Sequence, residues 1–214
     1  MRKGGLNVAD VHGLVEAKGV KGFLPAREAE ALFIKAREQA PLGPLLEVGS
    51  YCGRSAVYLG AAAAPFDQVV FTVDHHSGSE EHQRGEAYFE AEHWDPVLRR
   101  VDTLSSLRRN LYLCAMEDVV TPIVARSEAL AKVWATPLAM VFIDGGHSEA
   151  QAKADCLLWA RHLMPNGVMA IHDIFERPED GGQAPYRAMQ AVMADYDLTL
   201  LDRTDSLVFL TFRQ

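Results

Sequence analysis

The sequence has few cysteines, no long apolar run and no excess of positive charge. Its three cysteines are an odd number without paired spacing, which is typical of a reducing compartment rather than of a disulfide framework. The longest nearly apolar stretch, 57–66, is far shorter than the roughly 20 residues that a membrane helix needs. Acidic residues outnumber basic ones by 29 to 21, which argues against general binding of nucleic acid or membrane surfaces. We therefore expect a cytoplasmic protein without nucleic-acid or membrane partners.

The sequence also has no internal repeat and no low-complexity segment. Its 214 residues, of which 49% are hydrophobic, suit one globular domain over 1–214 with a substantial core. Two helices are predicted within residues 1–44, over 6–17 and 26–40. Pro25 suits the start of the second helix.

Short apolar segments that alternate with helix-like segments follow. The predicted buried strands are 45–49, 68–74, 122–125, 139–143 and 168–171. A closing pair of strands is predicted over 198–201 and 207–212. Alternation of this kind predicts an α/β fold in which a mostly parallel, Rossmann-like sheet ends in an antiparallel strand and carries helices on both faces.

Residues 77–109 interrupt this alternation. The segment is rich in charged and aromatic residues and is too long for a simple link between a strand and a helix. We predict a partly helical insertion that caps the active site as a lid or forms a dimer contact. Together with the N-terminal helices it offers apolar surface beyond one core, so we expect a homodimer.

The segment 45–55, Leu-Leu-Glu-Val-Gly-Ser-Tyr-Cys-Gly-Arg-Ser, predicts a strand, a glycine turn and a helix N-terminus. Free backbone N–H groups at such a terminus bind anions, and Gly49 and Gly53 allow a close approach of the backbone to a ligand. Glu47, just before the turn, favours a ligand that also carries positive charge. S-adenosylmethionine, with its carboxylate and its cationic groups, is one such ligand.

Polar residues stand at the ends of the next two predicted strands. Asp74 ends the second strand, where a carboxylate can accept both hydroxyl groups of a ribose. His76 follows it and is a candidate to flank the nucleoside. Ser127, after the third strand, is expected near the adenine or at the N-cap of a helix.

Acidic residues and histidines follow the fourth and fifth predicted strands. Asp144-Gly-Gly-His147 comes after one strand and His172-Asp173 after the other. Because ligands of parallel sheets bind outside the carboxyl ends of the strands, these side chains are expected to converge. Two aspartates and a histidine suit Mg²⁺ or Mn²⁺, and His147 is a candidate general base at neutral pH.

With these motifs the chain resembles the class I S-adenosylmethionine-dependent methyltransferases. More narrowly it is similar to the metal-dependent sugar O-methyltransferases of the macrolide-sugar and mycobacterial methylmannose type. The segments that carry the resemblance are 45–55, Val73-Asp74, 141–148 and 163–173.

The resemblance implies cofactor, metal and catalytic roles for individual residues. The expected cofactor-binding residues are Glu47, Gly49, Ser50, Gly53, Ser55, Asp74, His76, Ser127 and Asp144. The expected metal ligands are Asp144, His172 and Asp173, although an acid usually stands at the position of His172. His147 matches the family's general base, and the acceptor is expected to be a small molecule, a sugar or oligosaccharide hydroxyl.

Other functions share parts of this pattern. A catechol or phenol O-methyltransferase would use the same metal, because two adjacent oxygens can chelate it. A metal-dependent hydrolase could use the acids and histidines without the glycine turn. A nicotinamide-dependent oxidoreductase has the same type of sheet but a different glycine spacing, and a non-catalytic binding protein could retain the pocket.

Overall fold

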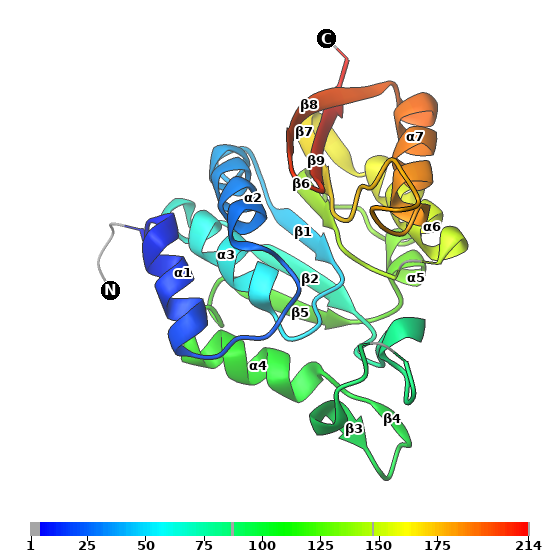
Figure 1. The fold of residues 1–214 in the computed structure, drawn as a ribbon. Helices are drawn as coiled ribbons and strands as arrows, with labels where there is room; N and C mark the ends of the chain where they lie inside the picture. The colour runs from blue at the N-terminus through cyan, green and yellow to red at the C-terminus, as the bar shows by residue number, and fades with distance from the viewer. Residues whose placement is uncertain (1–4, 87, 147, 214) are drawn as a thin grey trace.

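A seven-stranded sheet forms the centre of the computed structural model, which describes residues 5–86, 88–146 and 148–213. The strands lie in the order β5-β2-β1-β6-β7-β9-β8 (Figure 1). Their bounds are β1 Leu45–Val48, β2 Val70–Asp74, β5 Val120–Val124, β6 Leu138–Ile143, β7 Leu163–Ile171, β8 Leu198–Thr204 and β9 Leu207–Phe212. A separate two-stranded hairpin consists of β3 Trp94–Asp95 and β4 Arg100–Val101.

The first five strands of the large sheet are parallel, and β9 closes the sheet antiparallel to β7 and β8. The order reverses at β1, which pairs with β2 on one side and with β6 on the other. Parallel sheets bind ligands beside such a reversal, at the carboxyl ends of the strands. The predicted mostly parallel sheet with a closing antiparallel strand is confirmed.

Seven α-helices are described, and they cover both faces of the sheet (Figure 1). Their bounds are α1 Val8–Ala17, α2 Ala26–Gln39, α3 Arg54–Ala63, α4 Leu104–Leu113, α5 Ser127–Ala131, α6 Glu149–Ala160 and α7 Ala184–Tyr196. One buried cluster joins α1 to α4 to the sheet and includes Leu32 and Tyr58. A second cluster joins α5 to α7 to the other face and includes Trp159. The N-terminal helices are therefore part of the core.

Several element boundaries differ from the sequence-based expectation. The insertion was predicted to end at residue 109, which lies in the middle of α4. This helix is regular and amphipathic, and it packs Leu107 and Leu111 into the core. The remainder, 77–103, holds two short 3₁₀ turns and the β3–β4 hairpin. It therefore contains less helix than the sequence predicted.

The strand β7 begins earlier than predicted. Pro165 and Gly167 suggest a break, yet the strand runs from Leu163 because a register shift between Leu138 and Met140 accommodates the irregular segment. The start of α6 agrees with its sequence signal. Ser148 is the N-cap and accepts a hydrogen bond from the backbone N–H of Gln151.

Candidate active site

A cavity of about 770 Å³ opens at the carboxyl ends of β1, β2, β5 and β6. This volume lies within the range of small-molecule binding sites. Four of the residues predicted from the sequence line it: Gly49, Asp74, Ser127 and Asp144. Residues of the insertion, among them Ser79, His82 and Arg100, form the opposite wall.

The glycine turn after β1 fits closely against the end of β6. Gly49 has a φ of 93°, and a Cβ atom there would collide with the backbone carbonyl of Asp144. The position therefore requires glycine for both its backbone conformation and its contact. Gly53, with a φ of 88°, is the N-cap of α3.

Asp74 ties the glycine turn to β2. Its Oδ2 atom accepts hydrogen bonds of 3.0 Å from the backbone N–H groups of Ser50 and Tyr51. Its Oδ1 atom accepts one of 2.8 Å from the N–H of His76. A carboxylate has about four acceptor positions, so Asp74 retains capacity for one ligand hydroxyl in the cavity.

Glu47 lies beneath the turn rather than on the cavity wall. Its side chain is fully buried and accepts a hydrogen bond from the Thr72 hydroxyl, which also contacts the Ser50 hydroxyl. Burial raises the pKa of Glu47 to about 8, so the buried side chain is a neutral acid at pH 7.

The other predicted cofactor residues, Ser50, Gly53, Ser55 and His76, are also set back from the wall of the cavity. The ring of His76 is buried, and its Nδ1 atom lies 2.8 Å from the Thr103 hydroxyl. The cofactor roles of these residues stay predictions.

The far side of the cavity is polar. The Ser127 hydroxyl accepts a hydrogen bond of 2.7 Å from the indole N–H of Trp159. The Gln151 amide donates to both oxygens of Asp155, at 3.1 and 3.0 Å, and to Glu128 at 3.4 Å. Burial raises the pKa of Asp155 to about 6.

Sequence reasoning did not single out Glu128, Gln151 or Asp155 as site residues. Gln151 and Asp155 are four residues apart on α6 and so lie on one helix face. This spacing is the feature of the sequence that could have indicated a shared polar site. Only the packing of α6 against the sheet shows that this face reaches the cavity.

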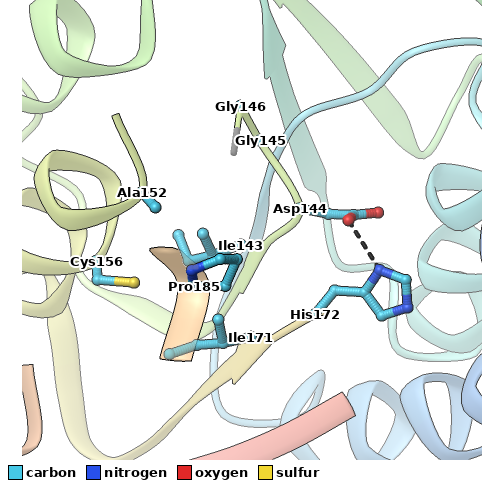
Figure 2. A pocket seen from close by; sticks show the side chains of 9 residues that line it. All are labelled: Ile143, Asp144, Gly145, Gly146, Ala152, Cys156, Ile171, His172 and Pro185. Carbon is cyan, nitrogen blue, oxygen red and sulfur yellow. Dashed lines mark hydrogen bonds and ion pairs between the residues drawn. The ribbon is translucent and has the colours of Figure 1, made fainter. Parts of the chain in front are cut away.

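The ends of β6 and β7 bring Asp144, His172 and Asp173 together. The Nδ1 atom of His172 lies 3.0 Å from Asp144 Oδ1 and 3.5 Å from Asp173 Oδ2. Figure 2 shows the Asp144 carboxylate facing the His172 ring, on the side of the strands away from Cys156 of α6. The predicted convergence of these residues is present in the structure.

Glu28 of α2 is a fourth member of this cluster that the sequence did not reveal. Its Oε2 atom lies 2.8 Å from the Nε2 atom of His172. The carboxyl group is nearly fully buried, and its Oε1 atom accepts hydrogen bonds from the backbone N–H and the hydroxyl of Ser206. Burial lowers the pKa of His172, but Asp144, Asp173 and Glu28 outweigh this effect and raise the pKa above its ordinary value.

The donor set of this cluster fits a divalent cation. One ligand atom from each of Asp144, His172 and Asp173 lies within 4.8 Å of the other two. Both ring nitrogens of His172 face carboxylates, so a cation would bind Nδ1 by displacing the proton that this atom shares with Asp144. Asp173 has a φ of 56°, an uncommon conformation that is often found at functional sites.

Aromatic rings gather at the mouth of the cavity. The Tyr51 ring centroid lies 5.4 Å from that of Phe23 and 5.2 Å from that of His82, and Tyr88 lies 5.3 Å from Phe23. Tyr51 and His82 also line the cavity, so this ring cluster is continuous with it. The predicted general base, His147, lies outside the described residues.

The profile of a family described as a methyltransferase domain matches residues 46–174 of the chain, which include the glycine turn, Asp74, Asp144, His172 and Asp173. The chain belongs to this methyltransferase family. The match confirms the resemblance to methyltransferases noted from the sequence. Among the described residues of this methyltransferase, no helix has the length and apolar character needed to cross a membrane.

Solved methyltransferases share the fold at low identity. The SAH-bound PaMTH1 of Podospora anserina is 16% identical with a TM-score of 0.69, and the match covers 95% of this chain and 88% of that one. TomG of Streptomyces achromogenes, an O-methyltransferase of tomaymycin synthesis in complex with SAM, is 15% identical with a TM-score of 0.63, over 97% and 90%. An O-methyltransferase of Bacillus cereus in complex with SAH is 13% identical with a TM-score of 0.61, over 96% and 90%.

Proposed function

We propose that this methyltransferase transfers the methyl group of S-adenosylmethionine to a hydroxyl group of a small acceptor, with a divalent cation at Asp144, His172 and Asp173. The observation that carries the proposal is the cavity at the reversal point of the sheet, which ends beside that cluster. Structures of the same fold bind SAM or SAH, which supports the choice of cofactor.

The cofactor has a complementary surface in the cavity. The N-terminus of α3, directly after the glycine turn, is proposed to bind the carboxylate of its methionine part, although Ser55 itself is set back from the cavity wall. The remaining acceptor position of Asp74 suits a ribose hydroxyl, and the polar group of Glu128, Gln151 and Asp155 suits the amino group of adenine.

The reaction is a direct displacement. The acceptor oxygen forms a bond to the methyl carbon while the carbon–sulfur bond breaks, S-adenosylhomocysteine leaves, and the hydroxyl proton passes to His147. Alignment of the two reacting groups can contribute on the order of 7–11 kcal/mol to lowering the barrier. A divalent cation held by Asp144, His172 and Asp173 would supply Lewis-acid polarisation of the acceptor hydroxyl.

We take a sugar hydroxyl as the first candidate acceptor, on the resemblance to sugar O-methyltransferases. The ring cluster of Phe23, Tyr51, His82 and Tyr88 favours a planar phenol or catechol as the second candidate, because aromatic rings pack well against one another. Cofactor binding is the same for both.

A methyl-transfer screen with labelled S-adenosylmethionine tests the function. Sugars, catechols and phenols are offered with added Mg²⁺ or Mn²⁺, and again after treatment with EDTA. We expect transfer to a hydroxyl compound that EDTA abolishes. His147→Ala is expected to keep cofactor affinity by calorimetry and to lower turnover by roughly 10²- to 10⁴-fold.

Two other results would contradict the proposal. Calorimetric binding of NAD in place of S-adenosylmethionine would indicate an oxidoreductase. Cofactor-independent hydrolysis by the metal-loaded protein would indicate a hydrolase.

The wider organisation of the protein is also proposed. We propose that residues 1–214 act as one methyltransferase domain, and that 77–103 is a lid, since its residues form one wall of the cavity. A homodimer and a cytoplasmic location remain predictions from the sequence. Light scattering of the purified protein tests the oligomeric state.

A further inference from the structure

The buried pair of Glu28 and His172 determines how the histidine faces the two aspartates. The Glu28 carboxyl group is held on its other oxygen by the backbone N–H and the hydroxyl of Ser206, at 2.6 and 2.8 Å. Both side chains of the pair are nearly fully buried. The ring of His172 therefore has little freedom to turn, and its Nε2 atom is committed to Glu28 at 2.8 Å.

The other ring nitrogen then becomes the available ligand. When a cation displaces the Nδ1 proton, the proton on Nε2 stays with Glu28, and the lone pair of Nδ1 becomes a ligand. That atom lies 3.0 Å from Asp144 Oδ1, a separation that two ligands of one metal ion can have. Histidine ligands of metals usually donate their second N–H to a carboxylate in this way, which fixes the ring and raises its basicity.

The nitrogen changes the metal that the site prefers. Mg²⁺ favours oxygen ligands and near-octahedral geometry, whereas imidazole nitrogen favours first-row transition metals. Asp144 and Asp173 are each about a quarter exposed, which leaves room for water or an acceptor hydroxyl on the open side. The donor set is thus two carboxylates and one imidazole with open positions.

We propose that Asp144, Asp173 and the Nδ1 atom of His172 bind a first-row transition-metal dication in preference to Mg²⁺, with Glu28 as the positioning residue of the histidine. The inference rests on the metal site of the proposed function and names the metal class and a further residue of that site. It predicts a metal–nitrogen bond, which an all-oxygen site cannot form.

Direct binding of Mn²⁺ to the EDTA-treated and dialysed protein, without cofactor or acceptor, tests the proposal. Electron paramagnetic resonance measures free Mn²⁺, and Mg²⁺ is added as competitor. We expect Mn²⁺ to bind more tightly than Mg²⁺ by on the order of tenfold or more. Pulsed spectra of bound Mn²⁺ are expected to show coupling to a directly bound ¹⁴N nucleus.

Three variants separate the roles of the two residues. Glu28→Gln is expected to weaken Mn²⁺ binding by roughly 10- to 100-fold, while Glu30→Gln, an exposed change on the same helix, leaves it unchanged. The double variant Glu28→Gln with His172→Asp is expected to lose the ¹⁴N coupling and to prefer Mn²⁺ over Mg²⁺ less than the unaltered protein does. Circular dichroism and thermal unfolding check that each variant is folded.

Contrary results are equally specific. Equal affinities for Mn²⁺ and Mg²⁺ in the unaltered protein, or bound Mn²⁺ without ¹⁴N coupling, would overturn the proposal. Absence of any metal binding would overturn it too and would leave His172 as an imidazolium that pairs with the carboxylates. Calorimetry of S-adenosylmethionine and methyl transfer in EDTA then show independently whether the proposed transfer itself survives.

Discussion

At the scale of single residues, the site depends on groups in unusual electrostatic states. Glu47 is a buried acid without a cationic partner among the described residues, and burial raises its pKa to about 8. Its neutral form accepts the Thr72 hydroxyl bond under the glycine turn. Such a group links the stability of the turn to pH.

Because the pKa of Glu47 is raised on folding, we predict that the stability of the protein decreases as the pH rises. The unfolded chain releases this proton near pH 4.5, whereas the folded protein retains it until about pH 8, so stability falls as the pH rises between these values. Glu47→Gln removes this group from the titration. We expect the melting temperature of the variant, relative to the unaltered protein, to rise from pH 5 to pH 8. Glu30→Gln is the exposed control, and parallel pH profiles for Glu47→Gln and the unaltered protein would contradict the assignment.

A second prediction for a single residue concerns the substitution of Gly49. An alanine there would combine a strained φ of 93° with a collision against the Asp144 carbonyl. We expect Gly49→Ala to cost about 1–3 kcal/mol in strain and to lose binding of S-adenosylhomocysteine by calorimetry. Gly13→Ala in α1, where a Cβ atom meets nothing within 4 Å, is expected to be neutral or slightly stabilising. A Gly49→Ala protein with full affinity would show that the turn can open without loss.

The sequence predicted the residues of the site that follow strands, but not those that reach it from elsewhere. Asp74, Asp144 and Asp173 could be placed because parallel strands end at a common edge. Glu28 could not, since its contact with His172 joins positions 144 residues apart and α2 carries no motif. Asp155 was missed for a similar reason, because a helix face acquires its role only when it packs.

At the scale of elements, the insertion is the part that local patterns describe least well. Most strands and helices with apolar periodicity were predicted to within a few residues, because burial determines their pattern. The amphipathic helix α4 was missed, since the predicted insertion included its first half. The segment 77–103 has no such periodicity, and contacts with distant residues hold it in place. Tyr51 donates a hydrogen bond of 2.9 Å to Glu90, which also pairs with Lys21 at 3.1 Å.

We therefore predict that substitution of Glu90 loosens the segment 77–103 locally. Glu90→Ala removes the acceptor that Tyr51 and Lys21 share, and we expect the local opening free energy of 77–103 to fall by about 1–2 kcal/mol. Hydrogen–deuterium exchange measures this effect, while global unfolding by denaturant changes little. Glu86→Ala, an exposed change in the same segment, is the control. Equal exchange in both variants would mean that Glu90 does not hold the segment.

At the scale of the whole molecule, two apolar layers sandwich the sheet, and the N-terminal helices belong to one of them. Leu32 of α2 is fully buried in the same cluster as Tyr58 of α3. The helices α1 and α2 are therefore a structural part of the methyltransferase fold, although the family match begins only at residue 46.

This arrangement predicts a global effect of a change far from the cavity. We expect Leu32→Ala to lower the free energy of unfolding by about 2–5 kcal/mol, measured with denaturant. Leu42→Ala, at a position that is about half exposed, is expected to cost much less. Similar losses for the two variants would show that α2 is not part of the cooperative core.

The link from Glu28 to Ser206 has a consequence for biosynthesis. The two residues are 178 positions apart, and the Ser206 backbone N–H is one of the groups that hold the Glu28 carboxylate toward His172. A growing chain on the ribosome contains the glycine turn, Asp144 and Asp173 before it contains Ser206. The final geometry of the histidine thus arises only after Ser206 has been synthesised, so products truncated before this residue would lack the final form of the proposed metal site.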